Sequence, residues 1–115
     1  MKIRLVQLDV IPGQPAGNAK QILAHIEQAR REQIDLLLLP EMSVPGYLIG
    51  DEWERSAFLR ECESWGDKIS AASQGITVVF GNIAVEWQQK NEDGRERKYN
   101  ALFVAEDGSF ITHPA

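Results

Sequence analysis

Cysteine is almost absent from this chain, which carries only Cys62 among its 115 residues. A single thiol forms neither an intrachain disulfide nor a zinc site built from several cysteines. Histidine is also scarce, because the chain has only two, and neither His25 nor His113 has a second histidine at ligand spacing. The sequence therefore predicts no bound metal.

Long apolar stretches are missing as well. No run approaches the roughly 20 residues that a membrane-spanning helix needs. The start of the chain, Met1–Arg4, is not followed by the long apolar core of a signal peptide. We therefore expect no contact with a membrane and a cytoplasmic location.

Basic residues are outnumbered, since 12 Lys and Arg stand against 17 Asp and Glu and give a formal net charge of -5. An acidic surface repels phosphate backbones, so nucleic acid is not expected as a partner. The densest charged segment, Asn91–Lys98, mixes both signs, and we interpret it as a solvated hairpin tip. With 43% hydrophobic residues and no repeat or linker, the chain has the composition of one globular domain spanning residues 1–115.

The first half of the sequence alternates between strand and helix patterns. Aliphatic and β-branched residues predict a strand at Ile3–Val10. Asn18 is a candidate N-cap for an amphipathic helix that we expect to end near Gln33. The run Leu36–Leu39 allows a helix or a strand by periodicity alone, but Pro40 ends the element and favours a short strand buried on both faces.

The second half repeats the helix pattern once and then changes to hairpins. An apolar stripe predicts a helix over residues 56–73, formed by Phe58, Cys62, Trp65, Ile69 and Ala72. Strands follow at 76–85, 99–105 and 109–112, separated by two Asp-Gly turn signals. This order implies an α/β fold with a mixed sheet and helices on one face.

Glu41 is the first candidate for chemistry, because it directly follows Pro40 at the end of the leucine strand. Ligands bind at the carboxyl ends of strands in open α/β sheets. A carboxylate held on such a strand end can serve as a general base. On position alone, however, a solvated loop glutamate is the more common case.

The residues around Glu41 change that balance. An aliphatic strand, the pair Pro40-Glu41 and the pair Gly46-Tyr47 resemble the pattern around the catalytic glutamate of the nitrilase superfamily of carbon–nitrogen hydrolases. The resemblance covers essentially the whole chain and includes Gly17-Asn18, Gly81-Asn82 and Tyr99-Asn100-Ala101. Two segments, 45–51 and 94–101, are most similar to the glutaminase region of glutamine-dependent NAD synthetases.

This resemblance implies an α-β-β-α sandwich, of which the chain would be an incomplete part, and a catalytic triad of glutamate, lysine and cysteine. The cysteine attacks the amide carbon, the glutamate moves protons and the lysine stabilises the oxyanion. Glu41 matches the glutamate. Tyr47 matches a tyrosine that lines the glutamine pocket, although a packed loop aromatic is an equally common role. The lysine and cysteine are expected beyond Ala115, so the chain alone is expected to be inactive.

Two residues of the chain could be mistaken for the missing pair. Cys62 lies on the apolar stripe of the second predicted helix, where a cysteine packs as a small apolar group. Helical spacing places Arg60 away from that stripe, so it is not expected to activate the thiol. Lys98 precedes Tyr99-Asn100, which is not the position of the catalytic lysine in the resembled family.

The resemblance also implies a reaction. The parent protein would hydrolyse glutamine, a small-molecule amide, and pass ammonia to a second domain that uses ATP to amidate deamido-NAD. This chain itself shows no ATP motif and is expected to bind no cofactor. The alternatives are a segment of a stand-alone amidase or carbamoylase and a non-catalytic remnant that acts by interaction. Because later strands of the family fold are missing, we expect a homo-oligomer or the rest of the domain to cover the exposed sheet.

Overall fold

A computed structural model describes residues 1–90 and 94–111. Its strands form one five-stranded sheet in the order β1-β2-β3-β4-β5. The strands are β1 (Ile3–Leu5), β2 (Leu36–Leu38), β3 (Thr77–Lys90), β4 (Glu96–Glu106) and β5 (Ser109–Phe110), and the helices are α1 (Pro15–Arg31), the 3-10 helix η1 (Gly50–Glu54) and α2 (Ser56–Ala71). β1, β2 and β3 are parallel, whereas β4 and β5 are added in antiparallel order. The predicted α/β class with a mixed sheet is confirmed.

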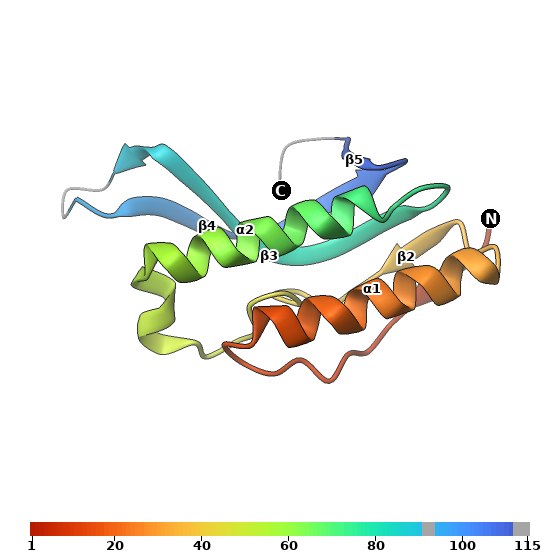
Figure 1. Ribbon diagram of the computed structural model, residues 1–115, viewed down its shortest axis with the longest axis horizontal. Helices are drawn as coiled ribbons and strands as arrows, with labels where there is room; N and C mark the ends of the chain where they lie inside the picture. Colours follow the sequence, from red (N-terminus) through yellow and green to blue (C-terminus); the bar gives the residue numbers. More distant parts are fainter. Residues whose placement is uncertain (91–93, 112–115) are drawn as a thin grey trace.

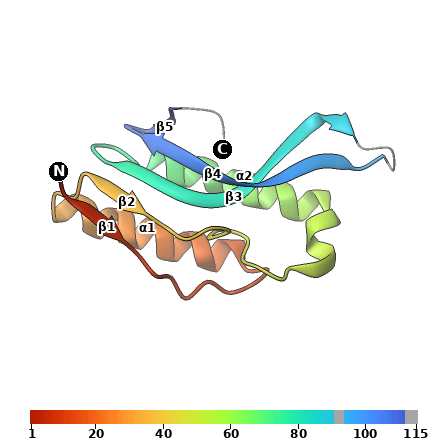
Figure 2. The same cartoon turned by 180° about the vertical axis from the view of Figure 1, so that it is seen from behind.

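The two long helices lie side by side on one face of the sheet, as predicted (Figure 1). From behind, the sheet is in front and α1 and α2 lie behind it (Figure 2). The β3–β4 hairpin is long, and its far end extends past the beginning of α2 (Figure 1). No helix in the described part of the chain is long and apolar enough to cross a membrane.

The first strand is shorter than the predicted Ile3–Val10. β1 ends at Leu5, and the N–H of Val6 still donates to the carbonyl of Leu38 at 3.0 Å. Pairing stops there because β2, its neighbour in the sheet, is itself only three residues long. A strand lasts only as long as its partner supplies hydrogen-bonding groups, and the sequence pattern does not contain that information.

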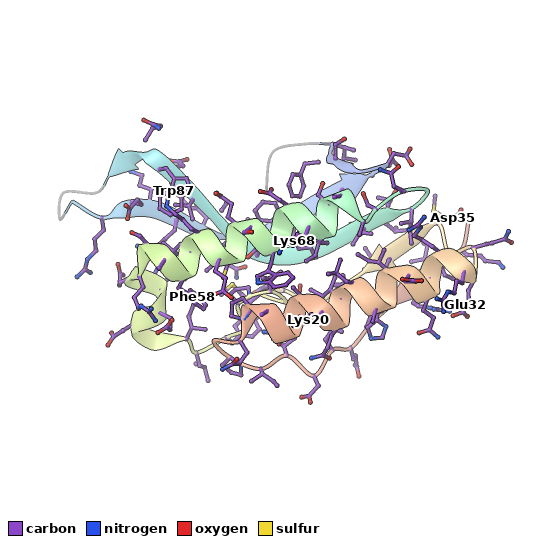
Figure 3. All side chains as sticks on the ribbon, viewed as in Figure 1. Lys20, Glu32, Asp35, Phe58, Lys68 and Trp87 are labelled. Atoms are coloured by element: carbon purple, nitrogen blue, oxygen red, sulfur yellow. The ribbon has the colours of Figure 1, made fainter. Side chains whose placement is uncertain are left out.

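α1 begins at Pro15, so the expected N-cap Asn18 is wrong. A proline suits the first helical position, because its fixed φ is helical and its missing N–H would have no helical partner there. The predicted apolar face is buried, and the helix ends at Arg31, two residues before the expected Gln33. At the end of α1, Glu32 pairs with Arg4 at 2.9 Å and Asp35 accepts the N–H of Lys2, which fastens the helix end to β1 (Figure 3).

β2 is buried on one face only, contrary to the prediction. Leu37 is fully buried on the helix side, whereas Leu36 and Leu38 are half-buried on the other side. The described chain has no second layer over that side, which we call the open face. Exposed apolar residues of the open face include Ile3, Leu5 and Leu102.

The hairpin is fastened to the helical layer near its outer end. Trp87 lies between the hairpin and α2 (Figure 3), where its indole N–H donates to Glu63 at 3.0 Å and the Arg60 guanidinium lies 3.9 Å from its ring centroid. Residues 91–93 of the predicted solvated tip lie outside the described residues. Within the described part, Lys98 is not solvated, because its side chain is 6% exposed and it donates to Glu54 of η1 at 3.0 Å.

Cys62 is fully buried in the core with Phe58 and Ile69 of the same stripe, while Trp65 and Ala72 are half-buried. Burial raises the pKa of the Cys62 thiol to about 12, and the negative charges of Glu61 and Glu52 add to that effect. Arg60 stacks on Trp87, so it does not serve as a cation for the thiol. The predicted packing role of Cys62 is confirmed.

We therefore expect Cys62 to be unreactive in the folded chain. A buried thiol with a raised pKa supplies almost no thiolate at neutral pH, and the thiolate is the reactive form. Titration with a thiol-specific chromogenic reagent should show slow labelling under native conditions and one rapid equivalent in denaturant. Rapid stoichiometric labelling of the native chain would contradict this expectation.

Candidate active site

The segment after β2 places Glu41 on top of β3. The N–H of Leu39 donates to the carbonyl of Val79, and the chain then turns through residues 41–46 instead of continuing as a strand. Ser43 shares its hydroxyl with Gly81, because Oγ accepts from the Gly81 N–H at 3.0 Å and donates to the Gly81 carbonyl at 3.2 Å. The Val44 N–H donates to the same carbonyl at 3.1 Å. The turn is therefore anchored on one residue of β3.

Gly81 is the residue that permits this close approach. A Cβ atom at that position would lie 2.8 Å from the Cα of Glu41 and would overlap the backbone nitrogen of Met42. Any side chain would therefore push the Glu41 turn away from the sheet. Met42 itself has a φ of 52°, a left-handed conformation that is strained for a non-glycine residue.

Asn18 fixes the same turn from the side of α1. Its side chain accepts the Ile11 N–H at 2.8 Å and donates at 2.9 Å to the carbonyls of both Ile11 and Val44. The Gly13 N–H donates to Pro45 at 2.9 Å, which adds a second link between the two loops. The actual role of Asn18 is thus to join the loop before α1 to the loop that carries Glu41.

The carboxylate of Glu41 receives two hydrogen bonds on one oxygen. The Tyr47 hydroxyl donates to Oε1 at 2.6 Å, and the Asn100 Nδ2 donates to the same oxygen at 2.8 Å. Glu41 is exposed and Tyr47 is 52% exposed, so the cluster is open to a ligand from the solvent. The structure thus brings together the two candidate residues Glu41 and Tyr47.

Asn100 is the member of this cluster to which the sequence assigned no role. It lies on β4, opposite Ile83 of β3, and is 59 residues away from Glu41 in the chain. Its place in the Tyr99-Asn100-Ala101 motif was visible, as was the fact that an amide interrupts an apolar strand. Neither signal shows which distant residue the amide contacts.

The two hydrogen bonds move the pKa values of Glu41 and Tyr47 further from neutrality. The bond from Tyr47, and to a smaller degree the bond from Asn100, lowers the pKa of Glu41 against a weaker opposing effect of burial. The same bond raises the pKa of the Tyr47 hydroxyl. Because the pKa of Glu41 is lower in the folded chain, these bonds stabilise the fold at pH values above the ordinary glutamate pKa. Their contribution to the free energy of unfolding is lost as the pH falls through the lowered pKa. At neutral pH the cluster is an ionised carboxylate with a protonated tyrosine.

The other polar candidates lie elsewhere. Cys62 is buried in the helical layer, and Lys98 is engaged by Glu54. A groove of about 750 Å³ lies between α2 and the β3–β4 hairpin. Asn100 is among the residues that line it, whereas Glu41 and Tyr47 are not. The Glu41 carboxylate at the end of β2 therefore lies outside this groove, and Asn100 borders both.

The fold and the site together define an α/β domain that carries an ionised carboxylate at the carboxyl end of a strand, where open α/β sheets bind their ligands. More particularly, the chain belongs to the carbon–nitrogen hydrolase family, whose model matches residues 2–113. The resemblance seen in the motifs around Glu41 is thereby confirmed.

The relatives that resemble this chain include NAD(+) synthetases and an amidase. A glutamine-dependent NAD(+) synthetase from Xylella fastidiosa is 39% identical over 82 residues, which are 70% of this chain and 15% of that protein. A 2-oxoglutaramate amidase from Bacillus subtilis is 33% identical over 95% of this chain and 39% of its own length. The solved structure of the NAD+ synthetase from Acinetobacter baumannii superposes with a TM-score of 0.78 at 25% identity, over 96% of this chain and 19% of that one. The chain thus spans less than half the length of each of these relatives.

Substitution of Gly81 by alanine should disturb both the fold and the cluster. The added methyl group overlaps the backbone at Met42, and overpacking of this kind costs about 1–3 kcal/mol of unfolding free energy. We expect the midpoint of urea unfolding of Gly81→Ala to fall accordingly. The matched control is Gly17→Ala, in helix α1, where a Cβ meets nothing within 4 Å. That control should unfold at the same or a higher urea concentration than the wild-type chain. A Gly81→Ala variant as stable as the control would show that the close approach of residue 81 to the Glu41 turn does not limit stability.

Proposed function

We propose that this chain is the amino-terminal part of a glutaminase-type amidohydrolase domain in which Glu41 is the general acid–base. The observation that carries the proposal is the carboxylate of Glu41, held at the end of β2 by hydrogen bonds from Tyr47 and Asn100. The carboxylate is ionised at neutral pH, since its pKa is lowered from the ordinary glutamate value, and it can therefore accept a proton. Family membership supports the assignment of this position to carbon–nitrogen bond hydrolysis.

The nucleophile and the oxyanion-stabilising lysine are proposed to come from sequence beyond residue 115. In the complete site, Glu41 takes the proton of the cysteine thiol as sulfur attacks the amide carbon. The tetrahedral intermediate collapses when Glu41 returns a proton to the departing ammonia. Water then attacks the thioester carbon and gives a proton to Glu41. Glu41 passes that proton to the cysteine sulfur as the carbon–sulfur bond breaks and the acid leaves, so that one amide and one water yield one acid and one ammonia.

Glutamine is the proposed amide. It is favoured because the relatives of this chain include several glutamine-dependent NAD(+) synthetases, and one from Thermotoga maritima is 32% identical over 96% of the chain. In such a parent protein the ammonia would pass to an ATP-dependent domain that amidates deamido-NAD. Tyr47 is proposed to line the amide pocket as well, because its ring is half exposed while its hydroxyl is held by Glu41.

A stand-alone amidase is the second candidate. The B. subtilis 2-oxoglutaramate amidase matches 95% of this chain, and the match makes up a larger share of its own length, 39%. The two candidates differ in the sequence that continues the chain after the domain and in the preferred amide. A coding sequence that continues into an ATP-dependent domain, with ammonia release from glutamine, supports the synthetase. Faster ammonia release from 2-oxoglutaramate supports the amidase.

Removal of the carboxylate tests the proposed function directly. Glu41→Gln keeps the shape of the side chain and an acceptor oxygen but cannot exchange the proton, so a protein with the complete domain should lose activity by about 100-fold or more. Its melting temperature should change little, because Glu41 is exposed and the glutamine keeps an oxygen that can accept the hydrogen bonds of Tyr47 and Asn100.

The control is Glu61→Gln, an exposed carboxylate on α2, which should keep full activity. Ammonia release from glutamine is the measurement. Unchanged turnover in Glu41→Gln would remove Glu41 from the mechanism and would favour a non-catalytic role for the chain. The 115-residue chain alone should release no ammonia above background.

We also propose that the open face of the sheet is covered in the working protein, by a second copy or by the rest of the domain. Leu5 is 76% exposed and Leu102 is 43% exposed on this face. Within the described residues, β1 is the outermost strand of the sheet and adds an unpaired strand edge. Exposed edges and apolar faces of this kind recruit other strands and surfaces.

The isolated chain should therefore associate. Sedimentation velocity at several concentrations should show an average mass that increases with concentration. Leu5→Lys and Leu102→Lys place charges on the open face and should shift the chain toward the monomer, whereas Ala24→Lys, at an exposed position of α1, should not. A wild-type chain that stays monomeric and binds no hydrophobic dye would show that the described fold is self-sufficient.

A further inference from the structure

We propose that Asn100 is a positioning residue for Glu41 and that, together with Tyr47, it reserves Oε2 as the oxygen that exchanges the proton. This inference rests on the proposed function, because it assigns a direction to the acid–base chemistry of Glu41. Its basis is that Tyr47 and Asn100 both donate to Oε1, at 2.6 and 2.8 Å.

Two donors fill one carboxylate oxygen. Each oxygen of an ionised carboxylate offers about two lone-pair directions, so Oε1 has little capacity for a further donor. Among the residues that the structure describes, the hydrogen bonds to this carboxylate go to Oε1 and none goes to Oε2. A thiol, a water or a leaving amine would therefore meet the carboxylate at Oε2.

Both donors suit a holding role rather than a proton-transfer role. An amide such as Asn100 does not titrate, so it orients the carboxylate without competing for the proton. Tyr47 is protonated at neutral pH and donates its only hydroxyl hydrogen to Glu41. The clamp is thus neutral and leaves the charge of the carboxylate available at the other oxygen.

The backbone makes the clamp rigid. Asn100 is on β4, in antiparallel register with Ile83, and β3 carries the Gly81 contact that places Glu41. Tyr47 follows Gly46, whose φ of +84° and close approach to Pro12 exclude a side chain. Both donors are therefore held by elements that themselves have little freedom.

The sequence context of Asn100 agrees with this role. Along β4, the residue two positions before Asn100 is Lys98 and the residue two positions after it is Leu102, so Asn100 lies where the strand changes from charged to apolar residues. Such a boundary position does not by itself require an amide. Within the described part of the chain, the Asn100 side chain donates its hydrogen bond to Glu41, so that contact gives the amide a reason to be there.

The first arm of the test uses the chain itself. Carbon-13 NMR of the glutamate carboxyl groups, with Glu41 assigned from the spectrum of Glu41→Gln, measures the pKa of Glu41. Asn100→Leu and Tyr47→Phe each remove one donor, so the pKa of Glu41 should rise in both. Asn100→Asp should raise it further, because a second carboxylate then lies within hydrogen-bond distance of the first. Gln88→Leu and Tyr99→Phe remove an amide and a hydroxyl elsewhere on the same hairpin and should leave it unchanged.

The second arm uses a protein with the complete domain. Asn100→Leu should lower kcat by about 10–100-fold with little change in KM, since a misplaced catalytic group slows chemistry more than binding. The acid limb of the pH profile of kcat/KM should move to higher pH, because Glu41 acts as a base only when ionised. Asn100→Gln carries the same amide donor on a longer side chain and should recover part of the rate.

The positioning role and the proposed function fail separately. An Asn100→Leu variant with unchanged rate, unchanged pH profile and unchanged Glu41 pKa overturns the positioning role, provided that Glu41→Gln is inactive. A fully active Glu41→Gln variant overturns the proposed function instead. A shifted Glu41 pKa in Asn100→Leu without any change in kcat also overturns the inference, because the clamp would then be structural only.

Discussion

The site depends on the contact between the backbone of Glu41 and residue 81. Because Gly81 has no side chain, the turn after β2 lies directly on β3 instead of passing above it. The other links depend on this distance: Ser43 reaches both backbone groups of Gly81, and Asn100 on the next strand reaches the Glu41 carboxylate. A strained Met42 is tolerated because the surrounding hydrogen bonds fix the turn on both sides. Local strain and close packing thus combine to give one exposed carboxylate a defined orientation.

A carboxylate held by neutral donors differs from one held in an ion pair. Tyr47 and Asn100 lower the pKa of Glu41 without cancelling its charge. The cluster therefore keeps a negative potential toward the solvent, which would attract a cation such as the lysine that we propose for the complete triad. An arginine or lysine in place of these donors would neutralise that potential and would weaken the attraction of the carboxylate for the lysine of the triad.

The sequence predicted those features that depend on neighbouring residues. Helical spacing correctly placed Cys62 in the core and identified the buried face of α1, and the motifs around Glu41 correctly indicated the family. The errors concern partners that are distant in sequence. β1 is short because β2 is short, Asn18 bonds to Val44 instead of capping its helix, and Asn100 meets Glu41 across the sheet. Periodicity carries no information about such contacts, although a lone amide in an apolar strand is a signal that one exists.

The arrangement of the strands also has a consequence for how the molecule folds. β3 and β4 are consecutive in the chain and pair along most of their length, whereas β1, β2 and β3 are joined by long crossovers through α1 and α2. Closing a short loop costs less entropy than closing a long one, so we expect the hairpin to form first and the parallel pairs later. Asn100 belongs to the hairpin, which forms early, whereas Glu41 follows β2, which pairs later. Their hydrogen bond is therefore among the last to form, and its presence reports that the chain has reached its native state.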